Sequence, residues 1–235
     1  MIVFIAGASG VGKSMLRDLT LEELHKLGLT ADFICMDNYC REIPEGKTIE
    51  DFRKETNFDS PDILDLNSLK AHINEWIKKN PIQTPKFKSK IEKCTGKRII
   101  LPTDVLIVEG IHAFYFVKHF LDINDTFFYK VFIETDTYRD IVDRRIVRNH
   151  LNQGSEKIKG SEKKNVGPAF FRLICSTRTL ADYFVDNSIH VAPALPGVLP
   201  AASTTAHPLR AAAKEIAASI EEKRNALVTE VSPPI

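Results

Sequence analysis

Eight consecutive residues near the N-terminus have the types and spacing of a phosphate-binding loop. They read Gly7-Ala8-Ser9-Gly10-Val11-Gly12-Lys13-Ser14 and fit G-x-x-x-x-G-K-[ST] at every fixed position. In such a loop, consecutive backbone N–H groups surround a phosphate chain, and glycines permit the close approach and positive φ angles this requires. Lys13 would reach the β- and γ-phosphates, and Ser14 would offer its hydroxyl to Mg²⁺. We therefore expect Gly7 to Met15 to bind the phosphates of ATP.

The segments on either side of this loop are those that such a site needs. Residues 1–5 form an apolar run typical of a buried strand, and leucines then recur at helical spacing until Gly28. A helix that begins at the loop points the positive end of its dipole at the bound anion. A glycine-rich turn that fits the motif by chance is the alternative, and it would not explain a strand before the loop and a helix after it.

Two acidic residues directly follow further apolar runs. The run 31–36 ends at Asp37, and the run 105–108 ends at Glu109. Ligands of open α/β sheets bind at the carboxyl edge of the strands, so we expect both carboxylates near the phosphates. Asp37 is the candidate carboxylate for an acceptor hydroxyl, and a Mg²⁺-shell or capping role fits its spacing equally well. Glu109 stands where NTPases place a metal-associated acid, which predicts a metal site shared with Ser14.

A basic helix is predicted over residues 137–150. Its arginines could neutralise a transferring phosphate from a lid over 144–167, and this adds Arg144 and Arg148 to Lys13 and Asp37 as candidate catalytic residues. An ordinary surface pair between Asp140 and Arg144 explains the same spacing equally well. The later part of the lid, rich in Gly, Ser, Lys and Glu, predicts a mobile loop.

The remaining segments give a coarse outline of one domain. Residues 42–66 are polar and are predicted to be irregular, and Asn67 is the expected cap of the helix that follows. The Lys-rich stretch 82–102, with Thr95-Gly96 as a turn signal, predicts a β-hairpin outside the main sheet. Further strands are expected over 129–133 and 182–186, and a helix over 170–179.

Composition changes near residue 191. Residues 191–205 are rich in Pro and Ala, which is typical of a linker. Beyond them, Pro208 suits a first helical position and an apolar stripe follows at helical spacing: Leu209, Ala213, Ile216, Ile220 and Leu227. We therefore expect a domain over 1–190, then a linker and a docked or semi-detached helix over 191–235.

Whole-chain properties narrow the class of partner. A formal charge of +1 over 235 residues argues against a polybasic surface for nucleic acid or an anionic membrane, so we expect a small-molecule partner. The four cysteines form no C-x-x-C pair, which favours reduced, mostly buried thiols. No apolar run approaches about 18 residues, and the first predicted strand leaves no room for a signal peptide, so we expect a cytoplasmic protein. Whether it forms a homo-oligomer stays open.

Two other classes of nucleotide-binding protein fit the sequence less well. A GTPase switch would carry N-K-x-D or T-K-x-D for guanine and D-x-x-G after a strand, and the chain has Val108-Glu109-Gly110 at that place. A mechanochemical ATPase usually has an additional sheet or partner domain, for which this chain is short.

Several motifs together resemble the uridine kinase and phosphoribulokinase family of P-loop kinases. Besides the phosphate loop, four segments are similar to the family's segments in the same order along the chain: Met36-Asp37-Asn38-Tyr39, Asn57-Phe58-Asp59-Ser60-Pro61-Asp62, Val108-Glu109-Gly110-Ile111-His112-Ala113-Phe114-Tyr115 and Thr135-Asp136 with the arginines that follow. Pro168-Ala169-Phe170 and Ala181-Asp182-Tyr183 also match. The resemblance covers about residues 1–187.

The resemblance implies an α/β P-loop NTPase fold with a five-stranded parallel sheet flanked by helices, a small β-hairpin insertion and a lid. It implies a phosphotransferase that uses ATP and Mg²⁺ to phosphorylate the 5′-hydroxyl of uridine or cytidine. By this match Asp37 is the general base and Asp59 holds the ribose. Tyr39 and Phe87 join Asp59 as candidate acceptor-binding residues, because Phe87 can stack on a ring.

The chain departs from the family on the side that would read the base. Pro85 is followed by Lys86-Phe87 where uridine kinases carry a Tyr-Asp pair, so the phenolic hydrogen bond is missing. The lid has Asn152-Gln153-Gly154 where R-G-R is expected. These departures keep other acceptors open: another nucleoside, a sugar phosphate or a pantothenate-like acid. A P-loop ATPase without an acceptor is the remaining alternative.

Overall fold

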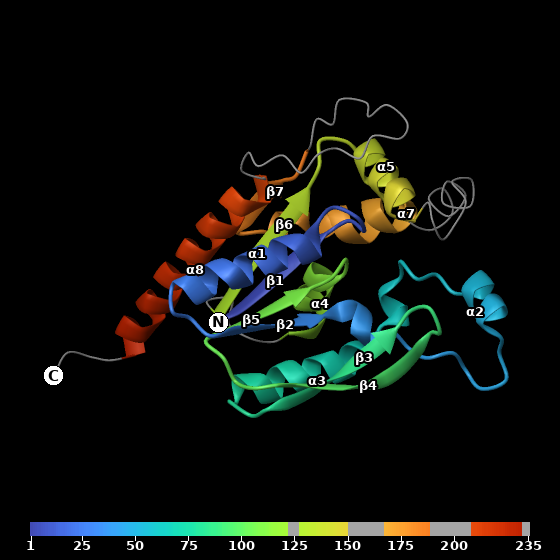
Figure 1. Ribbon diagram of the computed structural model, residues 1–235, viewed down its shortest axis with the longest axis horizontal. Coiled ribbons are helices and arrows are strands. Elements are labelled where there is room, and N and C mark those ends of the chain that lie inside the picture. Colours follow the sequence, from blue (N-terminus) through green and yellow to red (C-terminus); the bar gives the residue numbers. More distant parts are fainter. Residues whose placement is uncertain (122–126, 150–166, 189–207, 232–235) are drawn as a thin grey trace.

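A five-stranded, fully parallel sheet forms the centre of the protein (Figure 1). The computed structural model describes residues 1–121, 127–149, 167–188 and 208–231. The strands lie in the order β2-β5-β1-β6-β7, with these bounds: β1 Ile2–Gly7, β2 Ala31–Cys35, β5 Val105–Glu109, β6 Phe128–Glu134 and β7 Tyr183–Asp186. Every neighbouring pair is parallel. This confirms the predicted α/β sheet.

Two separate cores cover the two faces of the sheet. Because side chains alternate along a strand, Phe4 of β1 faces one core while Val3 and Ile5 face the other. The first core is closed by α3 (Leu66–Ile77) and α4 (Ala113–Phe120). The second is closed by α1 (Lys13–Lys26) and α8 (Pro208–Val231), which run side by side (Figure 1). Burial on both faces explains the unbroken apolar runs in these strands.

The hairpin forms a two-stranded antiparallel sheet of its own beside α3. It consists of β3 (Ile82–Lys88) and β4 (Lys93–Ile100). The expected turn at Thr95-Gly96 is wrong, because both residues lie within β4 and the strands are joined over residues 89–92, where Glu92 takes a positive φ of 47°. Arg98 ties the hairpin to β2: its Nη1 donates to the carbonyl oxygen of Phe33 at 2.8 Å, and its guanidinium lies over the Phe33 ring.

The connection predicted to be irregular, 42–66, contains short helices. Helix α2 (Ile49–Glu55) begins after Thr48, whose hydroxyl accepts from the Asp51 N–H, and a 3₁₀ turn η2 spans Pro61–Ile63. Asp65, rather than Asn67, caps α3 by accepting from the Ser68 N–H. The sequence signal for α4 is weak because the helix has only 8 residues, and an apolar segment of this length can be read as a helix or as a strand.

The segments after β6 follow the predicted order. Helix α5 spans Tyr138–Asn149, so residues 144–149 of the predicted lid are helical and the rest of it lies outside the described residues. The helix expected over 170–179 is found as a short α7 (Gly167–Ala169), a π-helical segment η5 (Phe170–Ile174) and a 3₁₀ segment η6 (Cys175–Leu180).

Helix α8 docks fully on α1. Leu209, Ala213, Ile216 and Ile220 are completely buried, whereas Leu227, the last residue of the predicted stripe, is half-buried. Arg224 of α8 donates to Asp104 at 2.7 Å. The predicted linker 191–205 lies outside the described residues.

Two further expectations can be compared with the described part of the chain. All four cysteines are free, but Cys94 is exposed and the others are half-buried, so the expectation of mostly buried thiols is wrong. Among the described helices, none combines the length and apolar character needed to span a bilayer.

Replacing Ile216 with Ala should destabilise the protein by about 2–5 kcal/mol, because it leaves a cavity between α8 and α1. The measurement is the free energy of unfolding in urea, with Glu222→Ala on the exposed side of α8 as the matched control. Equal unfolding free energies for the two variants would show that α8 is not docked in solution.

Candidate active site

The phosphate loop is pressed closely against the carboxyl ends of β6 and β7. A Cβ at Gly7 would lie 2.3 Å from the carbonyl oxygen of Ile133, and one at Gly12 would lie 2.8 Å from Nδ2 of Asn187. Both glycines also have positive φ angles, so glycine is required at both. Lys13 is 9% exposed, and its ammonium donates to the carbonyl oxygen of Ala8 at 2.8 Å.

Asn187, directly after β7, holds the phosphate loop through a side-chain hydrogen bond. Its Nδ2 donates to the carbonyl oxygen of Val11 at 2.7 Å, and its backbone N–H donates to the carbonyl oxygen of Glu134 at 2.8 Å. The side chain is 3% exposed. Sequence reasoning missed Asn187, although the rule that pointed to Asp37 and Glu109, a polar residue after a strand of the parallel sheet, applies to it as well.

Glu109 at the end of β5 and Ser14 at the start of α1 meet as predicted. The Ser14 hydroxyl donates to Glu109 Oε1 at 3.1 Å, and the Glu109 side chain is 4% exposed. The same oxygen accepts from Arg17 Nη1 at 2.8 Å. Arg17, which sequence reasoning missed, lies over the Phe33 ring with its guanidinium carbon 4.0 Å from the centroid.

This pair of oxygen donors suits a magnesium ion bound to a nucleotide. Mg²⁺ usually takes one or two protein oxygens and fills its other positions with water and phosphate oxygens. Ser14 and Glu109 supply such a pair directly beside the phosphate loop. Within the described ranges there is no group of three or more His, Cys, Asp or Glu side chains that could hold a metal without a nucleotide.

Asp37 lies in the 3₁₀ turn η1 (Met36–Tyr39), directly after β2, and its side chain is exposed. The pKa of the Cys35 thiol is raised well above its usual range, mainly by burial and then by the charges of Asp37 and Glu109. Burial and the charges of Asp37 and Glu92 raise the pKa of Cys40 to about 12. Both thiols therefore stay protonated. Cys35 is the register partner of Glu109 in the neighbouring strand, so Asp37, two residues further on, lies at the same edge of the sheet as Glu109.

A cavity of about 500 Å³ opens beside η1, between α3 and the hairpin. Its lining residues are Asn38, Tyr39, Cys40, Arg41, Glu42, Asp65, Ser68, His72, Gln83, Pro85, Cys94 and Lys97. Asn38 is the residue next to Asp37, so the cavity adjoins the candidate base. Most of the lining side chains are polar, which suits a polar ligand.

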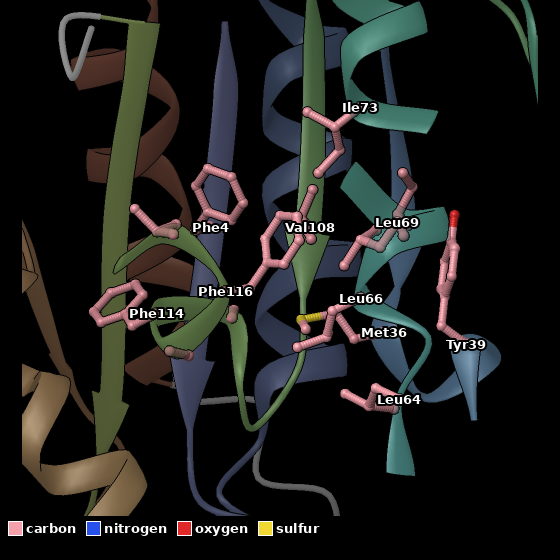
Figure 2. Close-up of a cluster of buried hydrophobic side chains, with 14 of the residues drawn as sticks. Phe4, Met36, Tyr39, Leu64, Leu66, Leu69, Ile73, Val108, Phe114 and Phe116 are labelled. Atoms are coloured by element: carbon pink, nitrogen blue, oxygen red, sulfur yellow. The ribbon is translucent and has the colours of Figure 1, made fainter. Parts of the chain in front are cut away.

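Tyr39 lines this cavity but is 2% exposed and belongs to the first core (Figure 2). Its hydroxyl lies 2.8 Å from Nδ1 of His72. Burial raises the pKa of Tyr39 and lowers the pKa of His72, so the two neutral groups share this hydrogen bond. The Tyr39 hydroxyl is thus already engaged within the protein.

Phe87 is not part of the cavity lining. An irregularity in the β3–β4 pairing between Pro85 and Phe87 shifts the register, which interrupts the alternation that would put both on one face. The Phe87 N–H instead donates to Asn38 Oδ1 at 3.2 Å, which holds the hairpin against η1.

Asp59, half-buried, lies in the loop 57–62. Its N–H donates to Asn57 Oδ1 at 3.1 Å, and its carbonyl oxygen lies 3.0 Å from Nε2 of His112. Arg41 Nε donates to the carbonyl oxygen of Asp62 at 3.1 Å. Two side chains therefore bind the backbone of this loop: His112 at Asp59 and Arg41 at Asp62.

Arg144 and Arg145 of α5 both contact the segments around the phosphate loop. The guanidinium of Arg144 donates to the carbonyl oxygen of Asn187, and Asp140 accepts from the Thr137 hydroxyl at 2.8 Å. The stem of Arg145 packs on the phosphate loop, where a Cβ at Gly10 would lie 3.0 Å from its Cγ. The Arg148 side chain lies outside what the structure describes.

The sequence model of the phosphoribulokinase and uridine kinase family matches residues 2–192. The chain belongs to this family. It is 27% identical over 187 residues to uridine kinase-like protein 4 of Arabidopsis thaliana, covering 78% of this chain and 38% of the plant protein. It is 28% identical over 179 residues to a uridine kinase of Ureaplasma parvum, covering 74% of this chain and 82% of that enzyme. This chain thus spans less than two-fifths of the plant relative.

The fold of the family is also found among solved structures. Phosphoribulokinase from Rhodobacter spheroides superposes with a TM-score of 0.59 at 14% identity, covering 85% of this chain and 74% of that one. At this identity the likeness concerns the fold alone, and it confirms the α/β architecture.

Replacing Asn187 with Ala should weaken ATP binding about five- to thirtyfold. The Val11 carbonyl oxygen then loses a buried hydrogen bond, and the phosphate loop is no longer supported by it. The measurement is isothermal titration with ATP. The control is Asn225→Ala, which makes the same chemical change at an exposed position of α8. An unchanged dissociation constant would contradict the supporting role of Asn187.

Proposed function

We propose that the protein is a kinase that transfers the γ-phosphate of ATP to a hydroxyl group of a small molecule, with the 5′-hydroxyl of uridine or cytidine as the first acceptor to test. One observation carries this proposal: the phosphate loop, the Ser14–Glu109 pair and Asp37 converge at one edge of the sheet. The printed names of the relatives, several of them uridine kinases, support the choice of acceptor.

The phosphate end of the site would bind ATP with magnesium. The N–H groups of the loop and Lys13 would hold the phosphates, and Ser14 and Glu109 would hold the metal ion. Bound Mg²⁺ would neutralise charge on the phosphate oxygens as the phosphoryl group is transferred. Arg17 already compensates the Glu109 charge at 2.8 Å, so it would keep that carboxylate oriented towards Ser14.

Asp37 would act as the general base for the acceptor hydroxyl. Its carboxylate is exposed in η1, directly before Asn38 of the cavity lining, so a hydroxyl group bound at that end of the cavity would be close to it. Asp59 would hold the acceptor from the opposite loop. Tyr39 would contribute the wall of the pocket, and Phe87 would place the hairpin through its backbone bond to Asn38.

The arginines would act at different places. Arg144 would act by holding Asn187, and thereby the phosphate loop, because its guanidinium donates to the Asn187 carbonyl. Arg148, one helical turn further along α5, stays the candidate for direct contact with the transferring phosphate. We infer a cytoplasmic setting, since free thiols and an ATP-dependent reaction suit a reducing compartment.

A second acceptor class is favoured by the cavity lining. Arg41 and Lys97 line the cavity together with two carboxylates, Glu42 and Asp65, and its aromatic side chains are His72 and Tyr39, which is 2% exposed. A hydroxyl compound that carries an anionic group, such as a sugar phosphate or a pantothenate-like acid, would find cations there. A nucleoside would find little aromatic surface to stack on, because the Tyr39 ring is buried in the core.

Replacing Asp37 with Asn should abolish phosphoryl transfer while leaving ATP affinity within about twofold, because the amide keeps the shape but cannot take the proton. The measurement is ADP formation with uridine, cytidine, other nucleosides, sugar phosphates and pantothenate, each offered to the parent protein and to the variant. Glu45→Gln, which removes another exposed carboxylate, is the control. Hydrolysis of ATP by the parent without any preferred acceptor would favour an ATPase instead.

Replacing Lys13 with Ala should lower turnover at least about a hundredfold with the fold intact, because one preorganised charge at the phosphates is worth a few kcal/mol. Steady-state kinetics and the thermal unfolding temperature are measured together, with Lys26→Ala at the exposed end of α1 for comparison. Turnover within twofold of the parent would refute the phosphate-loop assignment.

A further inference from the structure

His112 is a buried polar residue for which the proposed reaction has no role. It lies three residues after Glu109, directly before α4, and is 1% exposed. The Nε2 atom lies 3.0 Å from the carbonyl oxygen of Asp59, and among the described residues Nδ1 has no hydrogen-bond partner. An unpaired buried nitrogen costs free energy, so packing alone would be served better by an apolar side chain.

The protonation of the ring decides which nitrogen donates. Burial lowers the pKa of His112 to about 4, with Lys13 among the charges that lower it further. The ring is therefore neutral near pH 7 and has one N–H, and the carbonyl oxygen of Asp59 can only accept. The proton must then be on Nε2, and the His112 ring donates to the Asp59 backbone.

This bond joins two parts of the site that are far apart in the sequence. His112 follows the strand that carries Glu109, and the loop 57–62 carries Asp59. The Asn57 side chain accepts from the Asp59 N–H, while Arg41 binds at the far end of the loop, at the carbonyl oxygens of Asp62 and of the next residue, Ile63. The contact from the Glu109 strand to the Asp59 peptide is thus made by the imidazole N–H.

We propose that His112 is a positioning residue: its Nε2–H holds the Asp59 backbone at a fixed distance from the phosphate end of the site, and so sets the place of the bound acceptor. This rests on the proposed function, in which Asp59 contacts the acceptor. The ring itself touches neither ATP nor the acceptor.

Three variants separate this role from packing. His112→Leu keeps the volume and removes the donor. The amide N–H of His112→Gln reaches about as far as Nε2, whereas that of His112→Asn is shorter and corresponds to Nδ1. We expect Leu and Asn to raise the acceptor KM about tenfold while the ATP KM stays within twofold, and Gln to restore most of the acceptor KM. The proposal would be overturned by an acceptor KM of the Leu variant equal to that of the parent, or by an acceptor KM of the Gln variant no lower than that of the Asn variant. An equal rise of the acceptor KM and the ATP KM would overturn it as well.

A second measurement does not depend on activity. Amide hydrogen exchange over residues 57–63 should be faster in the Leu and Asn variants than in the parent and the Gln variant. Unchanged exchange in all three variants would overturn the proposal even if no acceptor is found. Failure of the proposed function has a different signature, namely a parent protein that shows no acceptor-dependent turnover. If the Leu variant does not fold, the comparison of Gln with Asn decides.

Discussion

A buried negative charge at the end of β5 constrains the arrangement of the whole site. The Glu109 carboxylate is almost completely removed from water, and a buried charge is tolerated only when it is paired and hydrogen-bonded. Ser14 and Arg17 of α1 provide these partners. The start of α1 is therefore fixed relative to β5, and the phosphate loop, which joins β1 to α1, has little freedom left.

The same charge also connects the hairpin to the nucleotide end of the protein. Arg17 lies over the ring of Phe33 in β2, and Arg98 of the hairpin lies over the same ring and binds the Phe33 carbonyl. Two guanidinium groups thus share one aromatic side chain. The hairpin, which forms one wall of the cavity beside η1, is held in place through Phe33 by Arg17, the residue that compensates the Glu109 charge.

The parts of the site that could be predicted depend on local sequence or on the geometry of parallel strands. The loop motif is contiguous, and Asp37 and Glu109 follow buried strands whose ends must lie at one edge of the sheet. The strand-edge rule could have placed Asn187 near the site, and His112 stands in one of the matched segments, but the partners of these residues and of Arg17 lie in distant segments. Asn187 and Val11, for example, are 176 residues apart. No local pattern encodes such a pairing.

Local features were mistaken where two signals competed. Asn67 and Asp65 are both good helix caps, and only the fold shows that the Asp65 carboxylate accepts from the Ser68 N–H. Thr95-Gly96 is a good turn sequence, but the hairpin turns earlier, where Glu92 adopts the left-handed conformation instead. Phe87 is half-buried and does not line the cavity, and the register irregularity between Pro85 and Phe87 interrupts the alternation along the hairpin strand.

The packing of α8 on α1 has a consequence for biosynthesis. The apolar face of α1 is formed by residues near the N-terminus, and its cover comes from a helix at the other end of the described chain. While the sheet and the phosphate loop emerge from the ribosome, that face stays open to water and to other chains. Completion of this core must therefore wait until translation has passed α8, so the nascent protein has a long interval in which chaperones can bind it.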